Sequence, residues 1–183
     1  MITNYQKILF AVFVTISILL TACKRDSRFE KPKIIYGQVE FIIKNNVTLE
    51  SIYQTILQQG IDNYLLSNFY YTKTIPADSM LYYHYLFLSQ PYVTNFNVFK
   101  KTGDTFTRFN NFVFQNFSDN NFIKWDSIVV HEHLIEMPDA GDGYNRSGLI
   151  YITYGQEKIW IDRLKSLPEI KSADYVYEYI PEF

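Results

Sequence analysis

The chain has little cysteine, glycine or proline, and no excess of charge of either sign. One cysteine among 183 residues excludes an internal disulfide. Seven glycines and six prolines are too few for a collagen-like repeat or a low-complexity segment. The formal charge of −2 argues against a basic surface of the kind that binds nucleic acid. What remains is a chain dense in tyrosine, phenylalanine and isoleucine, which indicates a folded domain with no nucleic-acid partner.

The first 22 residues predict an export signal. Lys7 gives a weakly cationic head, and Ile8 to Leu20 form an uncharged run. As a helix, this run of about 13 residues spans roughly 20 Å, which is short of the roughly 30 Å of a hydrocarbon core. Residues 1–22 are therefore interpreted as a signal peptide, not as a membrane span.

The end of this signal, Leu20-Thr21-Ala22-Cys23, resembles the lipobox of bacterial lipoproteins. The resemblance implies that the signal is removed before Cys23, that the thiol receives a diacylglycerol, and that the new amino terminus is acylated, for example with palmitate. Two or three acyl chains hold a protein firmly on a membrane. The alternative is an ordinary signal peptide followed by an unmodified cysteine.

The lipoprotein resemblance also organises the rest of the chain. Residues 23–33 are expected to be the lipidated cysteine and a polar tether, and residues 34–183 a single domain. In that family a residue other than Asp after the cysteine, here Lys24, favours the outer membrane. We therefore expect a protein anchored in the cell envelope at the outer membrane, with the periplasmic or surface side left open.

Hydrophobic periodicity predicts strand and helix pairs at both ends of the domain. Ile34–Ile43 has strand composition, and Thr48 can cap a helix that continues to Gly60. Near the carboxyl end, the predicted order is strand, helix and strand: Gly148–Tyr154, Gln156–Leu167 and Ile170–Ile180. These pairs predict an α+β fold, a two-layer sandwich with two helices on one face of a mainly antiparallel sheet.

A long all-β insert is expected between the two pairs. Its predicted strands are Met80–Leu88, Tyr92–Phe99, Thr105–Phe114 and Ile128–Met137, and Lys101-Thr102-Gly103-Asp104 is interpreted as a hairpin turn.

The order of elements is similar to the ferredoxin-like plan, and residues 164–176 resemble the last helix and strand of the inhibitory propeptides of subtilisin-like proteases. In that family the tail lies in the protease cleft, which would place Ile180 and Phe183 in apolar pockets. The resemblance covers only the two chain ends. The long insert departs from the family pattern, and so does Pro181, which lacks the N–H that a β-pairing cleft needs. The alternative is that the tail merely ends an edge strand.

Three histidines suggest a metal site. On a strand Ile128–Met137, His131 and His133 would project from the same face, roughly 6.5 to 7 Å apart. Two imidazoles at that spacing, with His84 as a third, could bind zinc and leave a position for water. Zinc is thus a possible cofactor, and ordinary hydrogen-bonded strand histidines are the alternative.

Other candidate sites are weaker. Glu132 and Glu136 would lie about 13 Å apart on that strand, too far for paired acid and base work, and are interpreted as surface charges. The loop Asp139 to Asn145 has calcium-type ligands without the EF-hand spacing. Trp125, Trp160 and the tyrosines could form a platform for a glycan or peptide. No nucleophile motif is present in the sequence.

Three functions follow, in order. The first is a non-enzymatic binding or assembly protein of the cell envelope, held to the membrane through Cys23, whose partner is an envelope protein or a glycan. The second is a protease-inhibitor module like the subtilisin propeptides. The third is a zinc-dependent enzyme that uses His84, His131 and His133.

Overall fold

The computed structural model describes residues 32–100, 105–137 and 145–178. Almost all of them belong to one unit, Ile34–Glu178; a second unit, Met1–Lys33 with Tyr179–Phe183, contributes only Pro32 and Lys33. Within the larger unit, the described residues form four helices packed on a seven-stranded, mostly antiparallel open sheet. In chain order the elements are β1 (Lys33–Ile43), α2 (Leu49–Gln58), β2 (Tyr64–Pro76), the 3-10 turn η1 (Ala77–Ser79), α3 (Met80–Leu88), β3 (Val93–Lys100), β4 (Thr105–Gln115), α4 (Asp119–His131), β5 (Ile135–Glu136), β6 (Ser147–Tyr151), α5 (Glu157–Lys165) and β7 (Ile170–Glu178).

The sheet runs in the order β3-β4-β2-β6-β1-β7, and the short β5 pairs with β2. Strand β6 lies between β1 and β2 and is antiparallel to both. Its Gly148 faces Phe41 on one side and Leu66 on the other. Strand β6 comes from the carboxyl-terminal part of the chain and lies between two strands from the amino-terminal part. Segments far apart in the sequence therefore form one continuous sheet.

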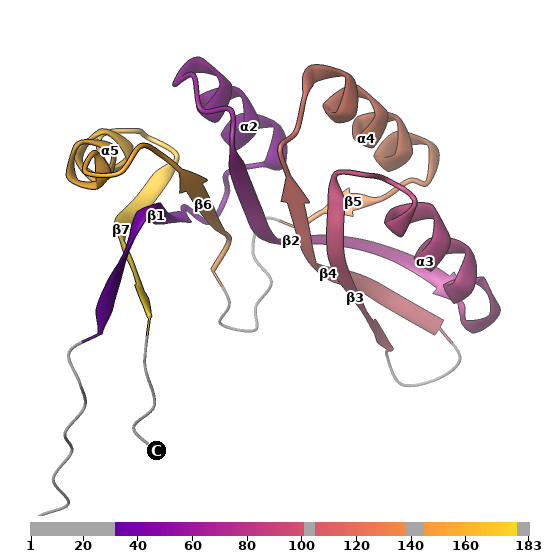
Figure 1. Cartoon of the computed structure of the whole chain (residues 1–183). Coiled ribbons are helices and arrows are strands. Elements are labelled where there is room, and N and C mark those ends of the chain that lie inside the picture. The colour runs from indigo at the N-terminus through magenta and orange to yellow at the C-terminus, as the bar shows by residue number, and fades with distance from the viewer. Residues whose placement is uncertain (1–31, 101–104, 138–144, 179–183) are drawn as a thin grey trace, which may run out of the picture. The chain divides into compact units, whose positions relative to one another are not determined.

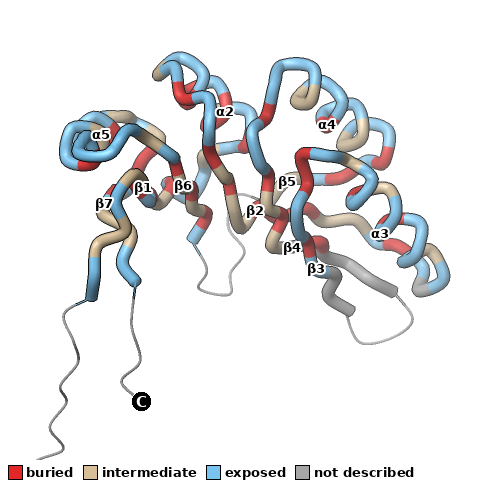
Figure 2. Tube along the Cα trace, in the orientation of Figure 1, coloured by how far each residue is buried: buried red, intermediate tan, exposed pale blue. Residues whose placement is uncertain are grey.

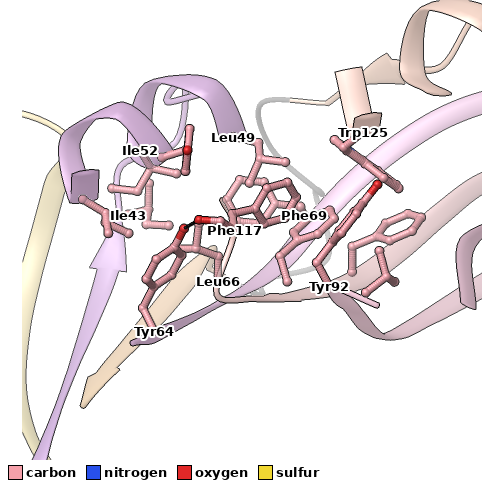
Figure 3. Packing of buried hydrophobic residues seen from close by; sticks show 14 of the residues in the cluster. Ile43, Leu49, Ile52, Tyr64, Leu66, Phe69, Tyr92, Phe117 and Trp125 are labelled. Atoms are coloured by element: carbon pink, nitrogen blue, oxygen red, sulfur yellow. Dashed lines mark hydrogen bonds between the residues drawn. The ribbon is translucent and has the colours of Figure 1, made fainter. Parts of the chain in front are cut away.

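The four helices lie over the same face of the sheet (Figure 1). All four contribute buried side chains to one hydrophobic cluster, among them Ile52, Phe87, Trp125 and Leu164. The cluster is rich in aromatic rings, and Figure 3 shows Tyr64, Phe69, Phe117 and Trp125 within it. The expectation of one helical layer on one sheet is confirmed, but with four helices instead of two.

The predicted first pair is confirmed. Thr48 caps α2, and its hydroxyl accepts a hydrogen bond from the backbone N–H of Ser51 at 3.2 Å. Gly60 follows the helix with φ +68°, a backbone conformation that glycine adopts without steric cost. The buried face of α2 includes Leu49, Ile52 and Ile56, as the apolar spacing predicts.

The predicted strand Met80–Leu88 is wrong, because this segment is the helix α3. A run that is apolar at nearly every position shows neither the twofold nor the 3.6-residue period, so pattern alone cannot separate the two structures. Tyr83 and Phe87 favour the helix, because their spacing of four residues puts both side chains on one helical face, where both are buried. The hairpin turn Lys101–Asp104 lies outside the described residues; its flanking strands β3 and β4 are antiparallel neighbours.

The predicted strand Ile128–Met137 is also wrong over most of its length. Helix α4 begins after its cap Ser118 and ends at His131, and only Ile135–Glu136 form a strand, β5. A Schellman turn closes the helix: the N–H of His133 bonds to the carbonyl of Val130, and that of Leu134 to Val129. His133 takes the left-handed position with φ +52°, where glycine is usual.

Strand β2 is the element that the sequence patterns did not predict. It is the longest strand of the described sheet, and it pairs with β4, β6 and β5. Asn68, with φ +63°, lies at a register shift between Leu66 and Phe69. This irregularity interrupts the alternation of buried and exposed side chains along the strand. The twofold hydrophobic period that would predict a strand from the sequence is therefore lost.

The closing elements match the prediction over the described range. The first residues of β6, α5 and β7 lie within one residue of the predicted starts. On α5, Ile161 and Leu164 are buried. Among the described helices, none combines the length and the apolar run that crossing a bilayer would need.

Candidate binding site

Among the residues that the structure describes, all four helices lie on one face of the sheet, and none covers the opposite face (Figure 1). On β1, Val39, Phe41 and Ile43 are buried toward the helices, while the residues between them, Glu40 and Ile42, point the other way. The same alternation occurs on β6, where Gly148 and Ile150 are buried and their neighbours are less so. A second, accessible set of side chains therefore covers the outer face of β1, β6 and β7.

These outer side chains form a hollow of about 650 Å³. Its lining includes polar residues, among them Ser67, Ser147, Ser172, Glu40 and Asp174, and the apolar residues Ile42, Leu149 and Val176. Phe41, Asn145, Gly148 and Ala173 complete the lining.

Gly148, on strand β6 beside the hollow, leaves space for the ring of Phe41 on β1. A Cβ atom at this position would come within 2.1 Å of the Phe41 ring, which is much closer than any contact between real atoms. The ring of Phe41 thus occupies the space of the missing side chain, opposite Gly148 in the ladder. Any larger residue would therefore require the ring of Phe41 to move.

The two carboxylates influence one another. Partial burial raises the pKa of Glu40, and the negative charge of Asp174 raises it further. A cationic group bound between them would remove this repulsion and would favour the ionised form of Glu40. The hollow is therefore suited to a ligand that carries positive charge and hydrogen-bond donors.

The lining of the hollow does not provide the base that a serine nucleophile needs. A serine nucleophile needs a base within hydrogen-bond reach, and the lining includes three serines but no histidine or lysine. No sequence motif predicted Glu40 and Asp174 as site residues. The signal that could have revealed Glu40 is its place as the one charged residue of the apolar run Ile34–Ile43.

The three histidines are not brought together as a metal site. His84 is exposed on α3 beside Phe96, with ring centroids 5.7 Å apart. His131 ends α4 and is exposed, and His133 lies in the left-handed turn after it, so the expected common strand face does not exist. Across residues 32–100, 105–137 and 145–178, no group of three His, Cys, Asp or Glu side chains is placed to hold a metal ion.

Glu132 is not a surface charge, contrary to the prediction. Only 6% of the residue is exposed, and it accepts hydrogen bonds from the hydroxyls of Tyr82 and Tyr83, both at 2.8 Å. The ammonium of Lys73 lies 3.1 Å from its Oε2, and Nδ1 of His131 lies 3.1 Å from its Oε1. Burial alone raises the pKa of Glu132, but these four partners outweigh it and lower the pKa to about 2.

This network has a structural purpose. Glu132 caps the carboxyl end of α4, where the helix dipole disfavours a negative charge. Lys73 on β2 and the tyrosines on α3 supply the compensating donors, so the network joins three elements.

Glu136 is also paired instead of free on the surface. Its Oε1 lies 3.1 Å from Nη2 of Arg146 and accepts the backbone N–H of Leu49 at 3.0 Å. Burial raises the pKa of Glu136, and the charge of Arg146 opposes that rise. Arg146, only 4% exposed, also donates to the carbonyls of Val47 and Met137 and stacks over Phe69. The guanidinium therefore joins β5 and the start of β6 to the turn before α2.

The aromatic platform is not present at the tryptophans. Trp125 is buried at the centre of the core, and its indole N–H donates to the hydroxyl of Tyr71 at 3.0 Å. Trp160 is half-buried on α5, with the guanidinium of Arg163 4.7 Å from the centre of its ring.

The remaining predicted sites lie outside the described residues. They are the lipidation site Cys23, the tail residues Ile180 and Phe183, and Asp139 to Tyr144 of the predicted loop Asp139 to Asn145. Comparisons with protein-family models, with curated protein sequences and with solved structures gave no match.

Proposed function

We propose that this protein is a lipid-anchored, non-enzymatic binding protein of the cell envelope, and that the hollow on its open sheet face holds a basic segment of a partner protein. Cys23 carries the lipid in this proposal, at the outer membrane. The hollow itself is the observation on which the proposal depends: an accessible cavity on the sheet, lined by two carboxylates, of which Asp174 raises the pKa of Glu40, and by three serines.

A protein partner suits this surface better than a glycan. Sugar rings usually stack on exposed aromatic side chains, but the one aromatic residue in the lining, Phe41, is buried against Gly148. A lysine or arginine side chain, in contrast, can pair with Glu40 and Asp174 while its stem contacts Leu149 and Val176.

The binding test uses the full-length, lipidated protein and short arginine or lysine oligopeptides as probes. The double variant Glu40→Gln with Asp174→Asn should weaken binding by about five-fold or more, because both anionic partners of the cation are removed. Asp126→Asn is the matched control, since it removes one exposed carboxylate of α4, away from the hollow. Equal weakening by the control, or no binding by the unaltered protein, would contradict the proposal.

The anchor is tested separately. In the native host, the mass of the mature protein should exceed that of residues 23–183 by one diacylglyceryl group, with or without a third acyl chain on the amino terminus, and the protein should fractionate with the outer membrane. Cys23→Ala should abolish both results. A soluble, unmodified wild-type protein would refute the lipid anchor without bearing on the hollow.

A second candidate function is a protease inhibitor like the propeptides of subtilisin-like proteases. Strand order supports it, because β7-β1-β6-β2 with α2 and α5 has the arrangement expected for the ferredoxin-like plan. In this proposal β3, β4, α3 and α4 are additions to that plan, and Ile180 and Phe183 enter the protease pockets. Removal of residues 180–183 should then abolish inhibition of a subtilisin-type protease, while Ile159→Ala, an exposed change on α5, should leave it intact.

A further inference from the structure

Helix α3 shows an apolar surface to the solvent. Its nine residues include no aspartate, glutamate, lysine or arginine. Leu81 and Tyr85 are 62% and 71% exposed, and Leu88, one turn further, is exposed as well. Figure 2 shows that α3 is largely exposed, with buried residues only at intervals.

The core does not account for these side chains. The inward face of α3 is already occupied, because Tyr83 and Phe87 pack against Phe109 with ring centroids 5.2 and 5.3 Å away. Leu81, Tyr85 and Leu88 follow the i, i+4, i+7 spacing of the opposite face. Such a surface costs free energy in water and is typical of a face that is covered by another apolar medium.

The other helices expose large apolar side chains too, among them Ile123 and Val130 on α4, but each of these helices also carries charged residues. The exposed face of α5 carries Lys158, Asp162, Arg163 and Lys165, with Ile159 as its one large apolar side chain. Helix α3 therefore differs from α5 in its lack of charge, not merely in exposing a leucine.

The proposed lipid anchor indicates what covers α3. The tether Lys24–Lys33 reaches at most about 35 Å when extended. Strand β3, which contacts α3, is the fourth neighbour of β1 in the sheet, about 19 Å away at the usual strand spacing. A domain that is held this close to a bilayer can bring α3 into contact with the membrane surface.

We infer that α3 lies in the membrane interface, with Leu81, Tyr85 and Leu88 in contact with lipid. This inference depends on the proposed anchor for its choice of a bilayer as the covering medium. Tyrosine is enriched at membrane interfaces, because its ring is apolar and its hydroxyl is polar. The hydrogen bonds from Tyr82 and Tyr83 to Glu132 hold the helix fixed on the domain, so the exposed face is presented without rearrangement.

The test uses the fact that Cys23 is the only cysteine in the sequence, and in the proposed mature protein its thiol is acylated. Leu81→Cys therefore introduces a single reactive thiol, which is labelled with the fluorophore NBD after the lipidated protein is reconstituted in vesicles of phosphatidylethanolamine and phosphatidylglycerol. Ile159→Cys is the matched control, since it is an equally exposed apolar residue (66%) on another helix.

The expected result at position 81 is a blue-shifted emission and a loss of fluorescence when nitroxide-labelled lipid is included. The probe at position 159 should remain water-exposed and insensitive to that lipid. Equal behaviour at the two positions overturns the inference. So does a probe at position 81 that is protected from aqueous iodide but not quenched by the labelled lipid, since α3 would then be covered by protein, for example by a second copy of the chain.

Failure of the anchor is recognised independently. If the mass of the reconstituted protein lacks the acyl chains, the anchor proposal is wrong. The change Cys23→Ser is then added, so that position 81 or 159 again carries the single thiol, and the same fluorescence comparison with protein added to preformed vesicles still decides the α3 contact. A second variant adds Leu81→Glu to a protein labelled at Leu88→Cys. Lipid quenching at position 88 should be lost in this variant and kept when the added change is Ile159→Glu.

Discussion

Tyr83 donates its hydroxyl proton to Oε2 of Glu132 across 2.8 Å, and this bond joins α3 to the end of α4. The same carboxylate lies 3.1 Å from Lys73 of β2. One buried negative charge thereby holds the end of α4 to β2 and α3, through partners that lie 49 to 59 residues earlier in the sequence.

Replacing Glu132 with Gln should lower the free energy of unfolding by about 1 to 3 kcal/mol, because two tyrosine hydroxyls and an ammonium lose a charged acceptor. Urea denaturation measures the change. Glu50→Gln is the control, since Glu50 is an exposed glutamate on α2 and should have little effect. Indistinguishable effects of the two variants would show that the network contributes nothing to stability.

The stability should also depend on pH through Glu132. Its pKa is lowered to about 2 from the ordinary 4.5, so the folded state favours the ionised form. The stabilisation is complete above about pH 4.5 and is lost as the pH falls toward 2. Glu40 and Glu136 have raised pKa values and contribute with the opposite sign.

The difference between wild type and Glu132→Gln therefore isolates the effect of Glu132. Unfolding free energies of both proteins are measured from pH 6 to pH 2.5. The gap between them should narrow as the pH falls below 4.5, and a constant gap would contradict the assignment.

Arg146→Met should destabilise the domain by about 3 to 5 kcal/mol, because it leaves Glu136 without its cation and two backbone carbonyls without a donor. Thermal and urea unfolding both measure this loss. Arg163→Met is the matched control, because Arg163 is exposed on α5 and stacks on Trp160. A comparable loss in the control would mean that burial of the ion pair is not the cause.

Gly148→Ala should destabilise the sheet by about 1 to 3 kcal/mol, since the new methyl group overlaps the Phe41 ring. Phe41→Leu should partly rescue Gly148→Ala, because a smaller side chain leaves room for the methyl group. A double-mutant cycle measures this coupling. Strictly additive effects would show that the two side chains do not compete for the same space.

Short-range patterns were enough to predict the elements at the two ends of the domain. Thr48 and Gly60 delimit α2 through their own backbone and side-chain chemistry, and the alternation along β1 reflects one buried face. In the middle of the chain the patterns predicted β3 and β4 but failed for the two helices α3 and α4. Ile128–Met137 looks β-rich by itself, but Phe122 and Trp125 precede Ile128 at helical spacing, and the buried Trp125 keeps the segment in α4.

The sequence by itself therefore determined the α+β class and the elements at both ends, because these depend on neighbours within a few residues. Only the tertiary structure decided that α3 is a helix with an uncovered apolar face, that Glu132 is buried among donors from β2 and α3, and that Glu40 and Asp174 share one hollow. The physical reason is the same in each case. Burial and pairing depend on which distant segments meet, and the local pattern of a segment does not contain that information.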